Sequence, residues 1–258
     1  MVGKVEEYLF RRIAEDRAIH VTLIDPEDQT PKSASFLAGE SEVGHSSAIM
    51  IGGSTIVSSA HLDSIVKAVK KSVSIPVVLF PNNITGVSRY ADAIWFMSLL
   101  NSSDAYFIAG AQVLAAPLIK KYGLETIPLG YLIIGEGGAA GVIGRASPIP
   151  YNKPELAVAH ALAAQYFGMR FVYLEAGSGA SKPIPAQMVQ IVKGTVDVPL
   201  LVGGGIRTGA QAKVIANAGA DIVVTSTVIQ KSAKPSVRLK IEEIVEGIKE
   251  GVGNRYRR

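Results

Sequence analysis

No cysteine occurs in this chain of 258 residues, and tryptophan occurs only once, as Trp95. Without cysteine, the chain cannot form disulfide bonds or thiolate metal sites, which fits a reducing compartment. The four histidines are scattered and show neither the HxxH nor the HExxH spacing of metal-binding motifs, so we expect each to be structural. These four are His20, His45, His61 and His160.

The chain also lacks a long apolar run and a large excess of one charge. Its formal net charge is +4, and three positive charges lie in the last four residues, Arg-Tyr-Arg-Arg, which we interpret as a solvated tail. No basic stretch with interleaved aromatic residues predicts nucleic-acid binding. Residues 105–119 are apolar but shorter than the about 18 residues that a membrane span needs. The first residues mix charges at helical spacing, unlike a signal peptide, so we expect a cytoplasmic protein without a membrane span.

What the sequence does contain is a regular alternation of short apolar runs with longer amphipathic stretches. Apolar runs without polar alternation are typical of parallel strands that are buried on both faces. Their mean spacing is close to the about 30 residues of one βα unit. The eight runs are residues 19–24, 47–51, 76–80, 93–97, 126–134, 170–174, 199–202 and 221–224. We predict an α/β protein with one domain over residues 1–258, a (β/α)8 TIM barrel, with an open doubly wound sheet as the alternative.

Helical patterns lie between most of these runs, with one exception. The expected helices cover residues 4–16, 59–72, 101–123, 153–168, 185–195, 208–219 and 236–251. In the third of them, we expect Asn101 or Ser102 as the N-cap and Gly123 as the end. Residues 81–92 are too short and too rich in turn residues for a full helix. We therefore expect a loop or extended segment after strand three and a gap in the outer wall.

Glycine and hydroxyl residues follow two of the last predicted strands. Residues 203–205 are three glycines after strand seven, and residues 225–227 read Thr-Ser-Thr after strand eight. Glycines allow backbone N–H groups to approach an anion closely. The loops after strands seven and eight are also where such barrels bind phosphate. The alternative, a tight turn, is less favoured because both strand ends carry donors. The pattern therefore predicts a phosphate site.

Strands six, one and two also end in residues that can carry chemistry. Tyr173 and Glu175 share one side of strand six, and a Gly-Ser-Gly loop follows, which is either flexible or a phosphate donor. Asp25 ends strand one, where it is either a turn former or a metal or acid–base group. Strand two ends in two glycines followed by Ser54 and Thr55. A carboxylate and a hydroxyl, completed by water and a diphosphate, suit Mg²⁺.

Six segments in this order carry a resemblance to a known family: HVTLIDPED, IMIGGST, VLFPNN, YLEAGSGA, VGGGIRT and DIVVTST. A single glycine motif is common among phosphate-binding barrels, but YLEAGSGA together with LIDPED and IGGS is specific. Over nearly its whole length, the chain resembles the geranylgeranylglyceryl phosphate synthase family. The resemblance implies a modified TIM barrel in which an extended segment replaces one outer helix.

The resemblance also implies an activity and its residues. The family joins sn-glycerol 1-phosphate to geranylgeranyl diphosphate with Mg²⁺ and releases diphosphate, forming the first ether bond of archaeal membrane lipids, so that the product passes to the membrane. By motif position, Asp25 and Ser54 would bind Mg²⁺, and Glu175 would take the proton of the reacting C3 hydroxyl. The residues implied for sn-glycerol 1-phosphate are Tyr173, Leu174, Glu175, Ala176, Gly177, Ser178, Gly179, Gly204, Gly205, Thr225 and Ser226.

A prenyl chain needs a long apolar trough, which we expect beside strands two to four at the missing helix. We expect Phe80, Trp95, Phe96 and Tyr131 to line it. Trp95 either fills the core or limits chain length, and Tyr131 either gates the trough or packs. The alternatives are a bacterial relative that makes heptaprenylglyceryl phosphate, a sugar-phosphate isomerase barrel, and a binder of phosphate ligands without catalysis. Apolar outer helices at residues 105–119 and 156–167 predict a homo-oligomer.

Overall fold

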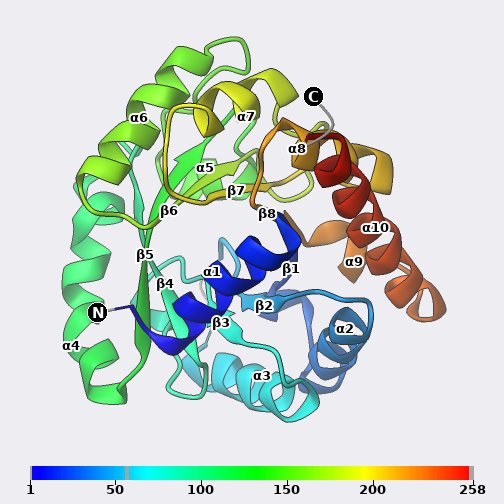
Figure 1. Cartoon of the computed structure of the whole chain (residues 1–258). Helices are drawn as coiled ribbons and strands as arrows, with labels where there is room; N and C mark the ends of the chain where they lie inside the picture. The colour runs from blue at the N-terminus through cyan, green and yellow to red at the C-terminus, as the bar shows by residue number, and fades with distance from the viewer. Residues whose placement is uncertain (1, 56–57, 256–258) are drawn as a thin grey trace.

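The computed structural model describes residues 2–55 and 58–255, so residues 256–258 of the basic tail lie outside the described residues. Eight parallel strands close into a barrel in chain order, and β8 pairs with β1 (Figure 1). The strands are β1 (Ile19–Ile24), β2 (Ala48–Ile51), β3 (Val77–Leu79), β4 (Ala93–Leu99), β5 (Glu125–Ile133), β6 (Phe171–Glu175), β7 (Leu200–Gly203) and β8 (Ile222–Thr225). The TIM-barrel prediction is confirmed, and each strand boundary lies within two residues of its predicted position.

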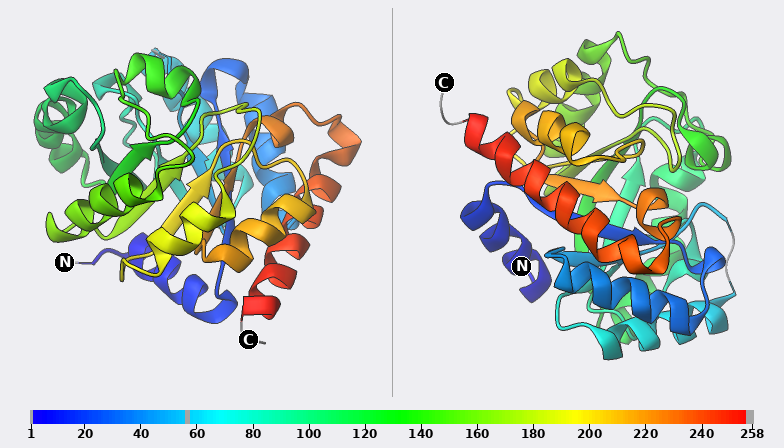
Figure 2. Two further views of the ribbon diagram at one scale, coloured as in Figure 1. Left: turned by 90° about the horizontal axis from the view of Figure 1, so that it is seen from above. Right: turned by 90° about the vertical axis from the view of Figure 1, so that its right-hand side faces the viewer.

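Helices surround the barrel and cover its outer face (Figures 1 and 2). The helices are α1 (Lys4–Asp16), α2 (Pro31–Val43), α3 (Ser59–Ser72), α4 (Ala111–Tyr122), α5 (Gly138–Ile143), α6 (Pro154–Tyr166), α7 (Ala186–Lys193), α8 (Gly209–Ala218), α9 (Thr227–Gln230) and α10 (Val237–Arg255). Short turns are η1 (Pro26–Asp28), η2 (Ile84–Gly86), the π-helical η3 (Tyr106–Gly110) and η4 (Lys234–Ser236). Within the described parts of the chain, no helix has the length and apolar character needed to cross a bilayer.

The segment between β3 and β4 confirms the predicted gap in the helical wall. Only the three-residue turn η2 lies there, where the other units of a (β/α)8 barrel place a helix. Beside the gap, the guanidinium of Arg89 lies 5.5 Å from the ring centroid of Tyr90 and 5.7 Å from that of Tyr122 on α4. The side of the barrel between β3 and β4 therefore has no helix of its own, and α3 and α4 lie on either side of it, both in contact with η2.

Several helix predictions need correction. The helices α2, α5 and α9 were not among those expected, although Thr30 and Ser33 form a capping box at the start of α2. The predicted N-cap of the helix after β4 was also wrong. The buried side chain of Asn101 bonds instead to the backbone of Ile133, and Asp104 Oδ1 accepts the Tyr106 N–H at 2.9 Å. The predicted end at Gly123 is correct, since this residue has a φ of 64°.

The helix α1 seals the end of the barrel at which the strands begin (Figure 2, left). Glu125 at the start of β5 accepts the N–H groups of Val5 at 3.0 Å and Glu6 at 2.8 Å. The carboxylate of Glu6 is fully buried and pairs with Arg170, at 2.6 Å between Oε2 and Nη2. The helix α1 is therefore fixed across this end of the barrel by contacts with β5 and Arg170.

Candidate active site

Two adjoining cavities lie at the carboxyl ends of the strands. The larger has a volume of about 1090 Å³, part of it open to solvent, and the smaller has about 400 Å³. Four residues line both cavities: Leu23, Glu175, Ser178 and Ser226. Glu175 thus lies at the boundary between the two compartments.

The small cavity is built from the loops after β6, β7 and β8. Gly204 and Gly205 have φ values of 79° and 73°, a region that favours glycine. A Cβ atom on Gly204 would lie 2.5 Å from Oε1 of Glu175, so only glycine brings this loop so close to the carboxylate. Ser178 and Thr227 join two loops through a hydroxyl contact of 2.9 Å. The predicted residues that line this cavity are Tyr173, Glu175, Ser178, Gly179, Gly204, Gly205, Thr225 and Ser226.

The remaining predicted residues of the segment after Tyr173 take other positions. The side chains of Leu174 and Ala176 pack in the core layer between barrel and helices, because successive strand residues alternate in direction. Their side chains therefore do not line the small cavity. Gly177 acts through its backbone, since its N–H donates to Oε1 of Glu175 at 2.7 Å. Of this segment, the residues that line the small cavity are Tyr173, Glu175, Ser178 and Gly179.

The hydroxyl of Thr225 also faces the outer layer. It contacts Nε2 of His20 at 2.8 Å, and Nδ1 of the same ring contacts Ser46 at 2.8 Å. Burial lowers the pKa of His20 to about 3, so the ring is neutral and structural, as the sequence predicted for this residue. The hydroxyl of Thr225 is thus occupied, and this residue borders the cavity with its backbone.

Glu175 is buried, with a 5% exposed fraction, and is held by two donors. These are the Gly177 N–H and the hydroxyl of Tyr173. Burial raises the pKa of the Glu175 carboxyl, while the two hydrogen bonds lower it. Burial, together with the charge of Glu175, also raises the pKa values of Tyr131 and Tyr173 well above the ordinary range. Both phenols therefore keep their protons, and Tyr173 donates to a carboxylate whose pKa burial raises.

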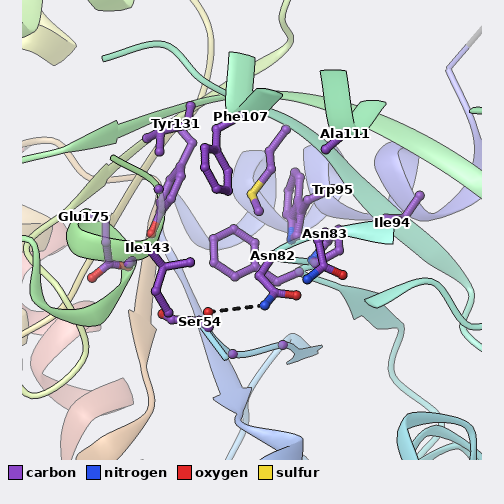
Figure 3. Close-up of a pocket in the computed structure, with 18 of the residues that line it drawn as sticks. Ser54, Asn82, Asn83, Ile94, Trp95, Phe107, Ala111, Tyr131, Ile143 and Glu175 are labelled. Atoms are coloured by element: carbon purple, nitrogen blue, oxygen red, sulfur yellow. Dashed lines mark hydrogen bonds between the residues drawn. The ribbon is translucent and has the colours of Figure 1, made fainter. Parts of the chain in front are cut away.

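The large cavity is lined mostly by apolar side chains. Figure 3 shows Glu175 and Ser54 on one side of it and Trp95 on the other. Phe80 packs edge-on against Tyr131, with 5.3 Å between ring centroids. Because no helix follows β3, the cavity reaches residues on both faces of β4, including Trp95 inside the barrel and Phe96 outside it. All four residues predicted for the trough line this cavity: Phe80, Trp95, Phe96 and Tyr131.

Asp25 and Ser54 both line the large cavity, and they follow the neighbouring strands β1 and β2. Oδ1 of the half-buried Asp25 accepts the Glu27 N–H at 3.1 Å. Among residues 2–55 and 58–255, no hydrogen bond reaches Oδ2 of Asp25. A Cβ on Gly53 would lie 2.4 Å from Oδ1, so the tip of β2 packs directly on this carboxylate. These hard oxygen donors fit Mg²⁺, which takes few protein ligands when a substrate supplies phosphate oxygens.

Comparison with known proteins decides the family. A family model described as the PcrB family matches residues 11–248. The chain belongs to the PcrB family. It is similar to the geranylgeranylglyceryl phosphate synthase of Thermofilum pendens, with 50% identity over 257 residues and 100% of both sequences covered. It is also similar to the geranylgeranylglyceryl phosphate synthase of Pyrococcus abyssi, with 51% identity over 249 residues that cover 96% of this chain and 99% of that protein.

A solved structure is similar over the same range. The crystal structure of (S)-3-O-geranylgeranylglyceryl phosphate synthase from Thermoplasma acidophilum, in complex with sn-glycerol-1-phosphate, has a TM-score of 0.91 and 40% sequence identity. The match covers 97% of this chain and 100% of that chain. The PcrB-family chain therefore shares its fold and nearly its whole length with this enzyme.

The sequence analysis did not single out three polar side chains of this PcrB-family chain that line the candidate site or hydrogen-bond to residues lining it. Arg207 lies on the small cavity and donates to the carbonyl groups of Gly205 at 3.1 Å and Gly179 at 3.2 Å. The sequence could have indicated Arg207, because it is the arginine of the VGGGIRT motif. Asn82 donates to the carbonyl oxygen of Ser54 at 3.2 Å (Figure 3). The third is Gln230, which follows the Thr-Ser-Thr segment.

Proposed function

We propose that this chain transfers the geranylgeranyl group of geranylgeranyl diphosphate to the C3 hydroxyl of sn-glycerol 1-phosphate and releases diphosphate. The observation that carries the proposal is the position of Glu175, which lines both a small polar cavity and a large apolar one. One carboxylate at this boundary can act on a hydroxyl that enters from one side and a prenyl carbon that enters from the other.

The small cavity suits glycerol phosphate. Its backbone N–H groups at Gly204 and Gly205 and the charge of Arg207 favour a phosphate dianion. The relative from Thermoplasma acidophilum was crystallised with sn-glycerol-1-phosphate, which supports the same substrate here. With the phosphate beside the β7 and β8 loops, the glycerol carbons extend toward Glu175.

The reaction exchanges one bond for another. The C3 oxygen of the glycerol forms a bond to the first prenyl carbon, the bond from that carbon to diphosphate breaks, and the hydroxyl proton passes to Glu175. The hydrogen bonds from Gly177 and Tyr173 orient the carboxylate for this transfer. Asp25 and Ser54 would hold Mg²⁺, which when bound stabilises the negative charge of the departing diphosphate.

The large cavity suits the prenyl chain, because burying each methylene contributes about 0.8 kcal/mol. Trp95 lines it from inside the barrel, where the indole is 1% exposed and packs on Phe171. We propose that Trp95 limits the length of the chain and that Tyr131, beside Glu175, gates the entrance. A heptaprenyl donor, the alternative, would need room beyond Trp95.

The test is incubation of labelled sn-glycerol 1-phosphate with prenyl diphosphates of graded length, with and without Mg²⁺. We expect the highest rate with the geranylgeranyl donor and no product without the metal. The sn-glycerol 3-phosphate enantiomer is the matched control. Fastest transfer from heptaprenyl diphosphate would favour the alternative, and no transfer from any donor would refute a prenyltransferase.

We also propose that the chain forms a homo-oligomer through its outer helices. Val113 and Leu114 on α4 are 70% and 57% exposed, and Tyr166 and Phe167 at the end of α6 are 78% and 74% exposed. Apolar patches of this kind mark association surfaces. Sedimentation velocity over a range of concentrations tests this, and a monomer throughout would contradict it.

A further inference from the structure

One glutamine side chain connects two loops that belong to different halves of the site. Gln230 ends α9, and its Oε1 accepts the backbone N–H of Asp25 at 3.2 Å and the Nε2 group of Gln29 at 3.1 Å. Its Nε2 donates to Oγ of Ser226 at 2.8 Å. A single amide thus joins the tip of β1, which carries the candidate metal ligand, to the tip of β8, which borders both cavities.

The orientation of this amide follows from its partners. The backbone N–H of Asp25 can only donate, so it requires the oxygen of the Gln230 amide. The nitrogen must then face Ser226, and because an NH₂ group only donates, Oγ of Ser226 is the acceptor. A flipped amide would place two donors against each other at Asp25.

This arrangement decides what the Ser226 hydroxyl can do. A serine hydroxyl has one proton, and the bond from Gln230 occupies an oxygen lone pair instead of that proton. The hydroxyl proton is therefore left to donate elsewhere, and Ser226 lines both cavities at their shared boundary. A partner that only accepts, such as a phosphoryl oxygen, matches a hydroxyl held in this way.

We propose that Gln230 is a positioning residue, which orients the Ser226 hydroxyl as a donor to a phosphoryl oxygen of a bound substrate and fixes the Asp25 loop beside it. The inference rests on the proposed function, because the substrates of that reaction supply the phosphoryl oxygens. Gln230 itself does not line either cavity, so its effect passes through Ser226 and Asp25.

Two substitutions separate this role from simple packing. Gln230→Glu keeps the size of the side chain and can still accept the Asp25 N–H, but a carboxylate would accept a hydrogen bond from the Ser226 hydroxyl instead of donating one to it. Gln230→Met keeps a similar volume, removes all three hydrogen bonds of the side chain and adds no charge. Gln29→Leu is the matched control, since Gln29 bonds to the same Oε1 but lines neither cavity.

The experiment measures kcat, the KM for sn-glycerol 1-phosphate and the KM for geranylgeranyl diphosphate, with thermal unfolding in parallel. A hydrogen bond to a charged group corresponds to roughly a ten- to hundredfold change in affinity. We expect Gln230→Met to raise the KM of one phosphate substrate by about tenfold and Gln230→Glu by more, with a smaller change in kcat. Which KM rises identifies whether Ser226 donates to the glycerol phosphate or to the diphosphate. The Gln29→Leu variant should match the wild type.

A double-variant cycle keeps the inference testable if the single variants lose stability. If Gln230 acts through Ser226, Gln230→Met should weaken binding little further in a Ser226→Ala background. Full additivity, or unchanged KM values in the Gln230 variants, would overturn the inference. A wild-type chain that transfers no prenyl group would instead refute the proposed function.

Discussion

The substitution Glu175→Gln tests the central chemical role in the site. Glutamine has the size of glutamate, and its carbonyl oxygen can still accept the Gly177 N–H that now reaches Oε1 at 2.7 Å. The loops after β6 and β7, proposed to bind phosphate, should keep their shape, because the Gly204 backbone packs on this same position. What the variant loses is the ability to take a proton at neutral pH.

The size of the effect follows from that loss. A positioned general base contributes about a hundred- to ten-thousandfold to a rate. Each tenfold loss corresponds to about 1.36 kcal/mol, so the barrier should rise by about 3–5 kcal/mol. The KM for sn-glycerol 1-phosphate should stay near the wild-type value, since the donors at Gly204, Gly205 and Arg207 are untouched.

The pH dependence gives a second readout. Burial raises the pKa of Glu175, and the base must be ionised, so the acid limb of the wild-type rate profile should lie above the range of an ordinary carboxyl. A carboxyl whose pKa is raised by folding stabilises the folded state below its unfolded pKa and loses this contribution as pH rises through its folded pKa. At neutral pH, the Gln variant should therefore unfold at a temperature equal to or above that of the wild type.

Steady-state kinetics with the geranylgeranyl donor, calorimetric binding of sn-glycerol 1-phosphate and thermal unfolding together check this prediction. Tyr173→Phe is the control, because it removes one hydrogen bond to the carboxylate but leaves the base. A Glu175→Gln variant with unchanged kcat would remove Glu175 from the chemistry. A loss of kcat accompanied by an equal loss of affinity for sn-glycerol 1-phosphate would refute the prediction that the small cavity keeps its shape in this variant.

Three further substitutions test the neighbouring parts of the site. Asp25→Asn should raise the Mg²⁺ concentration needed for half-maximal activity, and a metal titration identical to wild type would remove Asp25 as a ligand. Gly204→Ala should raise the KM for sn-glycerol 1-phosphate and lower the unfolding temperature, because its Cβ would lie 2.5 Å from Glu175 Oε1 at a φ of 79°; unchanged values of both would contradict this. Trp95→Ala should lower the free energy of unfolding by about 3–5 kcal/mol in urea titrations and admit longer prenyl donors, and an unchanged product length would exclude Trp95 as the limit.

The barrel itself was predictable because its strands are buried on both faces and therefore read as uninterrupted apolar runs. The helix α2 was missed for a related reason. Its buried face consists of Ala34, Leu37, Ala38 and Ser41, mostly small residues that give little apolar periodicity. The start of the helix was nevertheless visible as Thr30 followed by Pro31, a common cap and first-turn pair.

The site was predictable where chemistry follows directly from strand ends, as at Glu175 and Gly204. The alternation of side chains could also have excluded Leu174, since Tyr173 and Glu175 were already placed on the inner side of β6. Gln230 could not be found in this way. Its partner Asp25 lies 205 positions away in the chain, and only the closure of β8 onto β1 brings the two together.

Because no helix follows β3, the apolar cavity and the small polar cavity are built from different parts of the chain. Residues that shape the apolar cavity, such as Phe96 and Ala115, come from β4 and α4, whereas the proposed phosphate-binding residues and the proposed base come from β6 to β8. Substitutions in the first group can alter how much hydrocarbon is accommodated while the second group keeps its geometry. An enzyme built on this plan can acquire a new product length by mutation of one flank and retain the same bond-forming step.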